Sequence, residues 1–286
     1  MKKIKVGYLY DFKEGQDYMN DAVYHGLVDS GMFDVYEYGN PYYMLKSFSM
    51  ESIYGRGFTM FGKLDHTPNV EDHETMKEKI RKKFYDIIIY GCAYKGDHPF
   101  KELVASTYSK KEVHVIDGCD WTENFAISKG FDSFATVWKT SLTSFAYGNP
   151  IQFAIPESQL IDHIPNKEKL FSLYDPRSSG SYIYKNEKDY YNDYATSYYG
   201  VVIQRSQWNT MRVLEVLANR CIPYFIGIEN LPATMMVKFP RELLSEVNKY
   251  ASKNEVHPAY NEIAEELFHF TKSNLTTKEL IKIFLI

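Results

Sequence analysis

The chain is poor in cysteine and lacks long apolar stretches. Its three cysteines, Cys92, Cys119 and Cys221, have no C-x-x-C spacing, and each lies beside an apolar run. This pattern is typical of buried free thiols in a reducing compartment, not of a disulfide framework. No 18-residue apolar run could span a membrane, and the chain begins without the apolar segment of a secretion signal. We therefore expect a cytoplasmic protein with no membrane span.

Several chemical signatures are also missing. The net charge is −4, which argues against a protein that is basic all over and coats nucleic acid. No Asp-x-Asp, P-loop or Gly-x-Ser-x-Gly motif occurs, and the eight histidines are scattered without metal-ligand spacing. The missing Asp-x-Asp argues against metal-dependent sugar transfer of the GT-A type. We expect neither a metal nor a resident cofactor.

Aromatic residues are abundant, with 25 tyrosines and 18 phenylalanines among 286 residues. Tyrosine combines flat apolar area with a polar hydroxyl, which suits stacking on sugars or bases but also the filling of a core. Composition alone leaves both uses open. The length allows one large domain or two small ones.

Apolar periodicity in the first half predicts alternating strands and helices. Strands are expected over residues 3–10, 33–38, 85–90 and 112–116, and helices over 17–28 and 100–109. Such alternation predicts a doubly wound parallel sheet, in which ligands lie beyond the carboxyl ends of the strands. Asp11, Asp117 and Asp120 all follow predicted strands and are expected at such ends.

A second alternating unit follows a proline-containing stretch at residues 149–167, where we place a domain boundary. Strands are expected over 170–174, 199–204 and 221–227, and helices over 187–197, 209–219 and most of the chain from 242. The sequence therefore predicts an α/β protein with an N-terminal domain over residues 1–155 and a C-terminal domain over 156–286.

The segment from Tyr199 to Phe225 is the most informative for chemistry. A predicted strand runs through a short polar loop into a helix that starts near Asn209, a good N-cap residue. A helix start that faces a cleft favours a diphosphate, because free N–H groups and the helix dipole both attract anions. Arg212 and Glu215 share one helix face, where they can hold phosphate and ribose oxygens or simply pair with each other at the surface.

This segment resembles the C-terminal domain of exostosin-like and related GT-B glycosyltransferases, which carries Trp-Asp-x-x-Arg-x-x-Glu before Gly-Cys-Ile-Pro. The chain has Trp208-Asn209-Thr210-Met211-Arg212-Val213-Leu214-Glu215 and then Cys221-Ile222-Pro223. Further stretches, in order along nearly the whole chain, resemble a bacterial and viral (phage) branch of these enzymes: residues 54–59, 116–120, 153–157, 187–194 and 232–235. The branch has Lys-Lys and Gly before the Trp and a His after the Arg, where this chain has Gln204, Arg205, Gln207 and Val213.

The resemblance implies two Rossmann-like domains facing a cleft, with a nucleotide-sugar donor, expected to be UDP-linked, on the C-terminal domain. Arg212, helped by Arg205, would stabilise the departing diphosphate, and Glu215 would hold the ribose. Tyr199 or Trp208 would flank the base or sugar, with Asn209 at the helix start. The departures from the branch pattern bear on which donor is used.

Inverting transfer needs a base for the acceptor hydroxyl. GT-B phage DNA glucosyltransferases are similar in placing an Asp just past an N-domain strand, where Asp120 and Asp117 lie. Asp120 is preferred, because backbone N–H groups beside Gly118 could hold Asp117; Asp11 is a third candidate. The glycine loop Gly55-Arg56-Gly57 can approach the donor or the acceptor.

Two acceptor classes and one non-catalytic function stay open. The acceptor is a glycan, as the exostosin resemblance implies, or a hydroxymethylated base of viral DNA. DNA would require base flipping and a basic cleft rim, for which Lys77 to Lys83, Lys95, Lys101 and Lys110-Lys111 are candidates. The alternative is a binding or interaction module that keeps the nucleotide-sugar cleft without turnover.

Overall fold

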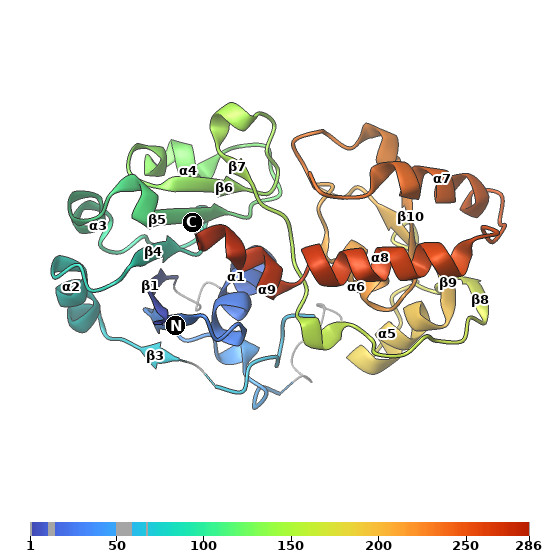
Figure 1. Cartoon of the computed structure of the whole chain (residues 1–286), viewed down its shortest axis with the longest axis horizontal. Helices are drawn as coiled ribbons and strands as arrows, with labels where there is room; N and C mark the ends of the chain where they lie inside the picture. Colours follow the sequence, from blue (N-terminus) through green and yellow to red (C-terminus); the bar gives the residue numbers. More distant parts are fainter. Residues whose placement is uncertain (1, 11–14, 50–58, 67, 286) are drawn as a thin grey trace.

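The computed structural model describes residues 2–10, 15–49, 59–66 and 68–285. Within them the chain forms two parallel β-sheets, one of seven strands and one of three, each accompanied by helices (Figure 1). The α/β class with parallel sheets, predicted from the alternation of strands and helices, is confirmed.

The large sheet is built by the first half of the chain. Its strands are β1 (Ile4–Leu9), β2 (Phe33–Glu37), β3 (Asn69–Val70), β4 (Ile87–Tyr90), β5 (Val113–Asp117), β6 (Thr136–Lys139) and β7 (Asn149–Pro150), in the order β3-β2-β1-β4-β5-β6-β7. Its helices are α1 (Tyr18–Asp29), α2 (His73–Arg81), α3 (Lys101–Thr107) and α4 (Phe125–Ser128). The strand order reverses direction between β1 and β4, which makes the carboxyl ends of these strands the topological switch point where ligands bind in such sheets.

The small sheet has the order β10-β9-β8 and belongs to the second half. Its strands are β8 (Lys169–Phe171), β9 (Ser197–Ile203) and β10 (Ile222–Ile226), and its helices are α5 (Glu187–Ala195), α6 (Met211–Ala218), α7 (Arg241–Ala251) and α8 (Tyr260–Asn274). The long helix α8 crosses this half toward the large sheet (Figure 1).

Most predicted elements form, with small shifts at their ends. Helix α6 begins at Met211 with Thr210 as its N-cap residue, two positions later than expected, because Asn209 is buried in the preceding loop. Strands β3, β6 and β7, helix α2 and the short helix α4 were not predicted. β6 has no apolar run that would predict a strand, because its last residue is Lys139, although that side chain is fully buried.

The two halves are joined by two passages of the chain that lie side by side. Ile155 donates its backbone N–H to Leu275, 2.9 Å away, and accepts from the N–H of Thr277 at 3.0 Å. The chain then ends in α9 (Thr277–Leu280) and a short 3-10 turn that lie beside α1 and the large sheet (Figure 1). One apolar cluster continues from the large sheet through Ile155 and Ile281 to the core of the small sheet.

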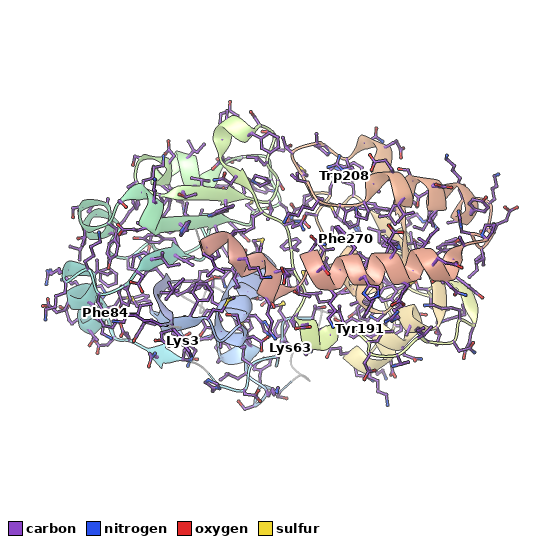
Figure 2. The ribbon with its side chains drawn as sticks, viewed as in Figure 1. Lys3, Lys63, Phe84, Tyr191, Trp208 and Phe270 are labelled. Carbon is purple, nitrogen blue, oxygen red and sulfur yellow. The ribbon has the colours of Figure 1, made fainter. Side chains whose placement is uncertain are left out.

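Along the border between the halves, side chains also make direct contacts. Lys63 forms a 2.7 Å ion pair with Glu187, and the hydroxyls of Thr59 and Tyr191 lie 2.7 Å apart. Figure 2 labels Lys63 and Tyr191, which contribute to these contacts from the first and the second half of the chain. Across the described residues, no helix is long and apolar enough to cross a membrane.

The contact between α1 and α9 depends on Gly26. A Cβ atom at this position would overlap the carbonyl oxygen of Thr277 and approach Ile281. We expect Gly26→Ala to lower the free energy of unfolding in urea by about 1–3 kcal/mol, because the C-terminal segment must move away. Hydrogen exchange in residues 277–281 should rise with it. Gly180→Ala is the matched control, since nothing lies within 4 Å of its added Cβ, and equal losses in both variants would contradict the packing argument.

Candidate functional site

A cavity of about 520 Å³ lies between the two halves, at the start of helix α6. It contains one predicted catalytic residue, Asp120, and four of the predicted donor-binding residues. The described residues that line it are Tyr18, Asp120, Phe153, Tyr174, Tyr182, Tyr190, Arg205, Gln207, Asn209, Thr210, Met211, Arg212 and Glu215. Tyr18 and Glu215, almost two hundred positions apart in sequence, therefore line the same cavity.

The start of α6 carries a concentration of unused hydrogen-bonding groups. The side chain of the N-cap residue Thr210 does not cap the helix. Nδ2 of Asn209, Oγ1 of Thr210 and Nε of Arg212 are buried, and none has a hydrogen-bond partner among the described residues. Because an unpaired buried polar group is costly, three together at the positive end of a helix dipole indicate a site for an anion.

Arg212 is held by an aromatic ring rather than by an acid. Its guanidinium lies 4.3 Å from the centre of the Tyr174 ring, and it forms no ion pair with any acid that the structure describes. The surface pair with Glu215 that the spacing allowed is not formed. A cation held only by a ring face keeps its charge and its planar fork for an incoming phosphate.

Glu215 is buried and links the two halves. Its Oε2 accepts a 2.6 Å hydrogen bond from Tyr190, and its Oε1 accepts one from Thr59. Each oxygen keeps further acceptor capacity toward the cavity. Arg205 is exposed at the mouth and donates from Nη2 to the carbonyl oxygen of Pro176 at 2.7 Å.

Three tyrosines form an aromatic wall of the cavity that the sequence did not single out. The ring centres of Tyr174 and Tyr182 lie 5.4 Å apart, and those of Tyr182 and Tyr190 lie 5.7 Å apart. Asp193 fixes the wall, because its carboxylate accepts from the backbone N–H groups of Leu173 and Tyr174 at 2.9 and 3.2 Å. The available signal was the tyrosine-rich stretch at residues 190–194, which contributes one of the three rings.

Trp208 and Tyr199 were expected to flank the base or the sugar, and both lie outside the described lining of this cavity. Trp208 is buried against Phe225, with ring centres 5.8 Å apart. Tyr199 is fully buried in β9, and its hydroxyl accepts from the backbone N–H of His257 at 2.9 Å. Neither is among the described residues that line the cavity, because both rings pack in the apolar core behind α6.

Asp120 lies at the border of two cavities, the one above and a second of about 380 Å³ over the carboxyl ends of β1, β4 and β5. Its Oδ1 accepts a 2.6 Å bond from Nε2 of Gln207, whose Oε1 accepts from Ser141 at 2.6 Å. Burial raises the pKa of Asp120, and the bond from Gln207 opposes that rise. An accessible carboxylate with a raised pKa at the border of two cavities suits proton abstraction.

Asp117, the second residue predicted as the base, is placed differently. It is fully buried, forms a 3.0 Å ion pair with the equally buried Lys139, and accepts from the backbone N–H groups of Cys119 and Ala126 at 3.3 and 3.2 Å. It lines neither cavity. All its contacts hold the turn after β5.

Four predicted residues lie outside the described residues: Asp11 and the loop residues Gly55, Arg56 and Gly57. In the part of the chain that is described, no group of three or more His, Cys, Asp or Glu side chains could hold a metal ion.

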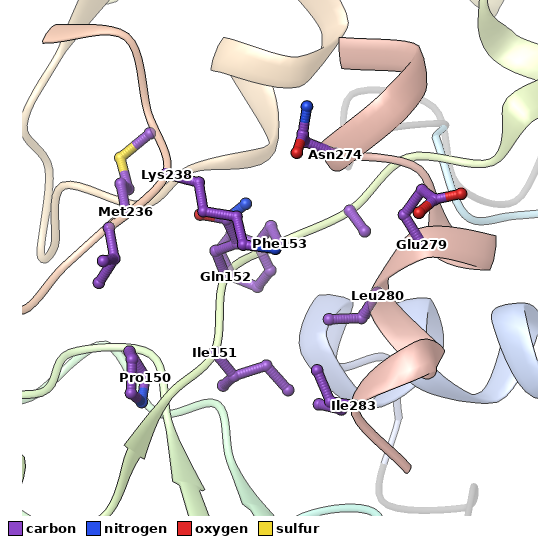
Figure 3. Close-up of a pocket in the computed structure, with 12 residues that line it drawn as sticks. Pro150, Ile151, Gln152, Phe153, Met236, Lys238, Asn274, Glu279, Leu280 and Ile283 are labelled. Atoms are coloured by element: carbon purple, nitrogen blue, oxygen red, sulfur yellow. The ribbon is translucent and has the colours of Figure 1, made fainter. Parts of the chain in front are cut away.

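A third cavity, of about 190 Å³, lies beside the paired passages between the halves (Figure 3). Its wall is mostly apolar, with Ile151, Phe153 and Leu280 among the lining residues. Two of its polar side chains are already engaged, since Asn274 donates to the carbonyl of Phe270 and Glu279 accepts from Lys282. This cavity is smaller than the first one, and none of the predicted site residues is among its described lining residues.

Comparison with known proteins adds no family: no family model matches the chain, and no curated protein matches it significantly.

Asp117, the last residue of β5, and Asp120, which follows the strand, should differ in their effect on stability. We expect Asp117→Asn to lower the free energy of unfolding by about 3–5 kcal/mol, because it leaves the buried Lys139 charge without its partner. Asp120→Asn should cost about 1 kcal/mol or less, since no buried cation depends on it. Urea denaturation measures both, and Asp117→Asn combined with Lys139→Met should recover part of the loss. Equal effects of the two single changes would contradict the structural role of Asp117.

Proposed function

We propose that this protein is a glycosyltransferase of the GT-B type, in which two Rossmann-like domains face a cleft. It transfers a sugar from a nucleotide-sugar, UDP-linked in our proposal, to an acceptor hydroxyl, with inversion and without a metal. The observation that carries the proposal is the uncapped start of α6, where three unpaired buried polar atoms share one cavity with Asp120.

The donor lies in the cavity of about 520 Å³. Its diphosphate accepts from Asn209, Thr210 and the first amides of α6, and Arg212 provides a bidentate fork. The nucleobase of the donor lies against the wall of Tyr174, Tyr182 and Tyr190, and the hydroxyls of its ribose reach Glu215. Arg205 at the mouth adds a second positive charge near the phosphates.

Asp120 acts as the base. Its carboxylate takes the proton of the acceptor hydroxyl while the hydroxyl oxygen forms a bond to the anomeric carbon. The bond from that carbon to the phosphate oxygen breaks, and the nucleoside diphosphate leaves with the electron pair. Arg212 and the helix dipole stabilise the negative charge that develops on the leaving group.

The rival function is a module that binds the nucleotide-sugar without turnover. The bond between Gln207 and Asp120 favours it, because an engaged carboxylate is a weaker base. The two functions share the donor site and differ only in turnover.

Donor binding tests the site at α6. In a thermal-shift series with UDP, GDP and CMP, we expect UDP to raise the melting temperature of the wild type by several degrees, since a ligand at 100 times its Kd adds about 2.7 kcal/mol. Arg212→Met should weaken UDP binding at least tenfold. Arg81→Met is the control, because Arg81 is an exposed arginine on α2 that pairs with Glu78. If none of the three nucleotides shifts the melting temperature at millimolar concentration, the proposed donor site is wrong.

Turnover tests Asp120. The base works only when ionised, so nucleotide release should be present above the pKa of Asp120 and lost as pH falls through it. Because the bond from Gln207 lowers this pKa, Gln207→Leu should move the acidic limb of the pH–rate profile to higher pH. Asp120→Asn should reduce the rate by about 10²–10⁴-fold.

Gln204→Leu is the control for the pH profile, since Gln204 is exposed in the same loop and outside the cavity lining. Donor binding by the wild type without release of nucleotide at any pH would favour the binding module.

A further inference from the structure

The second cavity, of about 380 Å³, contains none of the proposed donor-binding residues, yet it opens onto Asp120. The described residues that line it are Gln16, Asp17, Tyr18, Tyr94, Gly118, Cys119, Asp120, Trp121, Phe125 and Phe153. Tyr18, Asp120 and Phe153 also line the donor cavity, so the two spaces adjoin at the proposed base. The cavity lies over the carboxyl ends of β1, β4 and β5, at the switch point of the large sheet.

Its rim is aromatic and uncovered on one side. The indole of Trp121 is 65% exposed, its ring centre lies 6.5 Å from that of Phe125, and Phe125 lies 6.1 Å from Tyr94. Leaving a large apolar ring in water forgoes stabilisation of the order of 1–3 kcal/mol, so a cluster of rings beside a reactive carboxylate indicates a binding surface. The C–H face of a pyranose ring fits such a surface.

The charge of this cavity selects against phosphate. Among the described lining residues, the charged side chains are Asp17 and Asp120, both acidic. Asp17 also caps α1, because its Oδ1 accepts from the N–H groups of Met19 and Asn20 at 3.0 and 2.9 Å. The start of α1 is thus already occupied by a carboxylate, whereas the start of α6 is open. Carboxylates accept hydrogen bonds from neutral hydroxyls and repel phosphates.

Several of the basic residues that could have formed a DNA-binding rim are paired with acids or bonded to backbone oxygens. On α2 and just after it, Lys77 pairs with Glu74 at 3.8 Å, Lys82 with Glu78 at 3.1 Å, and Lys83 with Glu112 at 3.0 Å. None of these three lysines lines either cavity. Lys95, next to Tyr94, donates to the carbonyl oxygen of Gln16 at 2.9 Å.

We propose that this cavity is the acceptor subsite and that it binds a neutral saccharide. One pyranose ring lies against Trp121 and Phe125 and presents a hydroxyl to Asp120, which takes its proton as the bond to the anomeric carbon forms. Trp121 selects the acceptor through the apolar face of the sugar. This subsite rests on the proposed glycosyltransferase function.

The test compares acceptor kinetics in the wild type, Trp121→Ala, Trp121→Phe and the control Phe145→Ala. Phe145 is likewise exposed on the large-sheet half, at 57%, but lines neither cavity. The probes are methyl glycosides of glucose, galactose, mannose and N-acetylglucosamine, and a 12-base-pair duplex with 5-hydroxymethylcytosine. We expect Trp121→Ala to raise the KM for the accepted glycoside at least tenfold with kcat changed less than threefold, Trp121→Phe to restore most of the loss, and Phe145→Ala to match the wild type.

Two outcomes overturn the subsite: transfer to the duplex but to none of the glycosides, or the same glycoside KM in Trp121→Ala as in the wild type. Saturation-transfer NMR with the same glycosides measures binding without a donor. Glycoside binding that disappears in Trp121→Ala supports the subsite. If the wild type also binds no nucleotide, the transferase function is rejected and the saccharide site is kept. Glycoside binding that survives in Trp121→Ala rejects the subsite alone.

Discussion

Lys139 extends from the end of β6 beneath the turn that follows β5. Its Nζ donates to the carboxylate of Asp117 at 3.0 Å and to the carbonyl oxygen of Cys119 at 2.9 Å. The next two residues are Asp120 and Trp121, so one buried ammonium group fixes the backbone that presents both. A buried ion pair is costly to desolvate. Here both partners also bond to the backbone, Lys139 to the carbonyl oxygen of Cys119 and Asp117 to the N–H groups of Cys119 and Ala126. The border between the two cavities therefore depends on an ion pair whose two residues are not among the described lining residues of either cavity.

The starts of two helices differ in how far their free amides are already satisfied. Helix α1 begins at a carboxylate, Asp17, which satisfies its first free amides. Helix α6 begins without a side-chain cap and with Arg212 in its first turn, free of any ion pair among the described residues. A helix start that is already neutralised has little affinity for an anion, whereas an open one attracts it. This contrast supports a nucleotide diphosphate on one side and an uncharged acceptor on the other.

The sequence predicts features that arise from local periodicity and misses those that depend on distant partners. The strand-helix alternation and the grouping of Arg212 and Glu215 on α6 follow from spacing, as does the position of Asp120 beyond a strand. The burial of Lys139 does not, because it requires Asp117 on a neighbouring strand 22 positions away. Likewise, Trp208 carries the sequence signal of a ligand-binding aromatic, and only the packing of β10 against α6 shows that its ring fills the core.

The same distinction explains the departures from the glycosyltransferase pattern around α6. Val213 is fully buried, so the difference from the histidine of that pattern lies in the core and not among the described residues of the cavity lining. Asn209 and Gln207 do line the cavity, and both bring amide donors. An amide at position 209, where the pattern has a carboxylate, removes a negative charge from the place where the diphosphate would lie. Gln207 spans the border and bonds both Ser141 and Asp120, so the substituted loop couples the donor side to the proposed base.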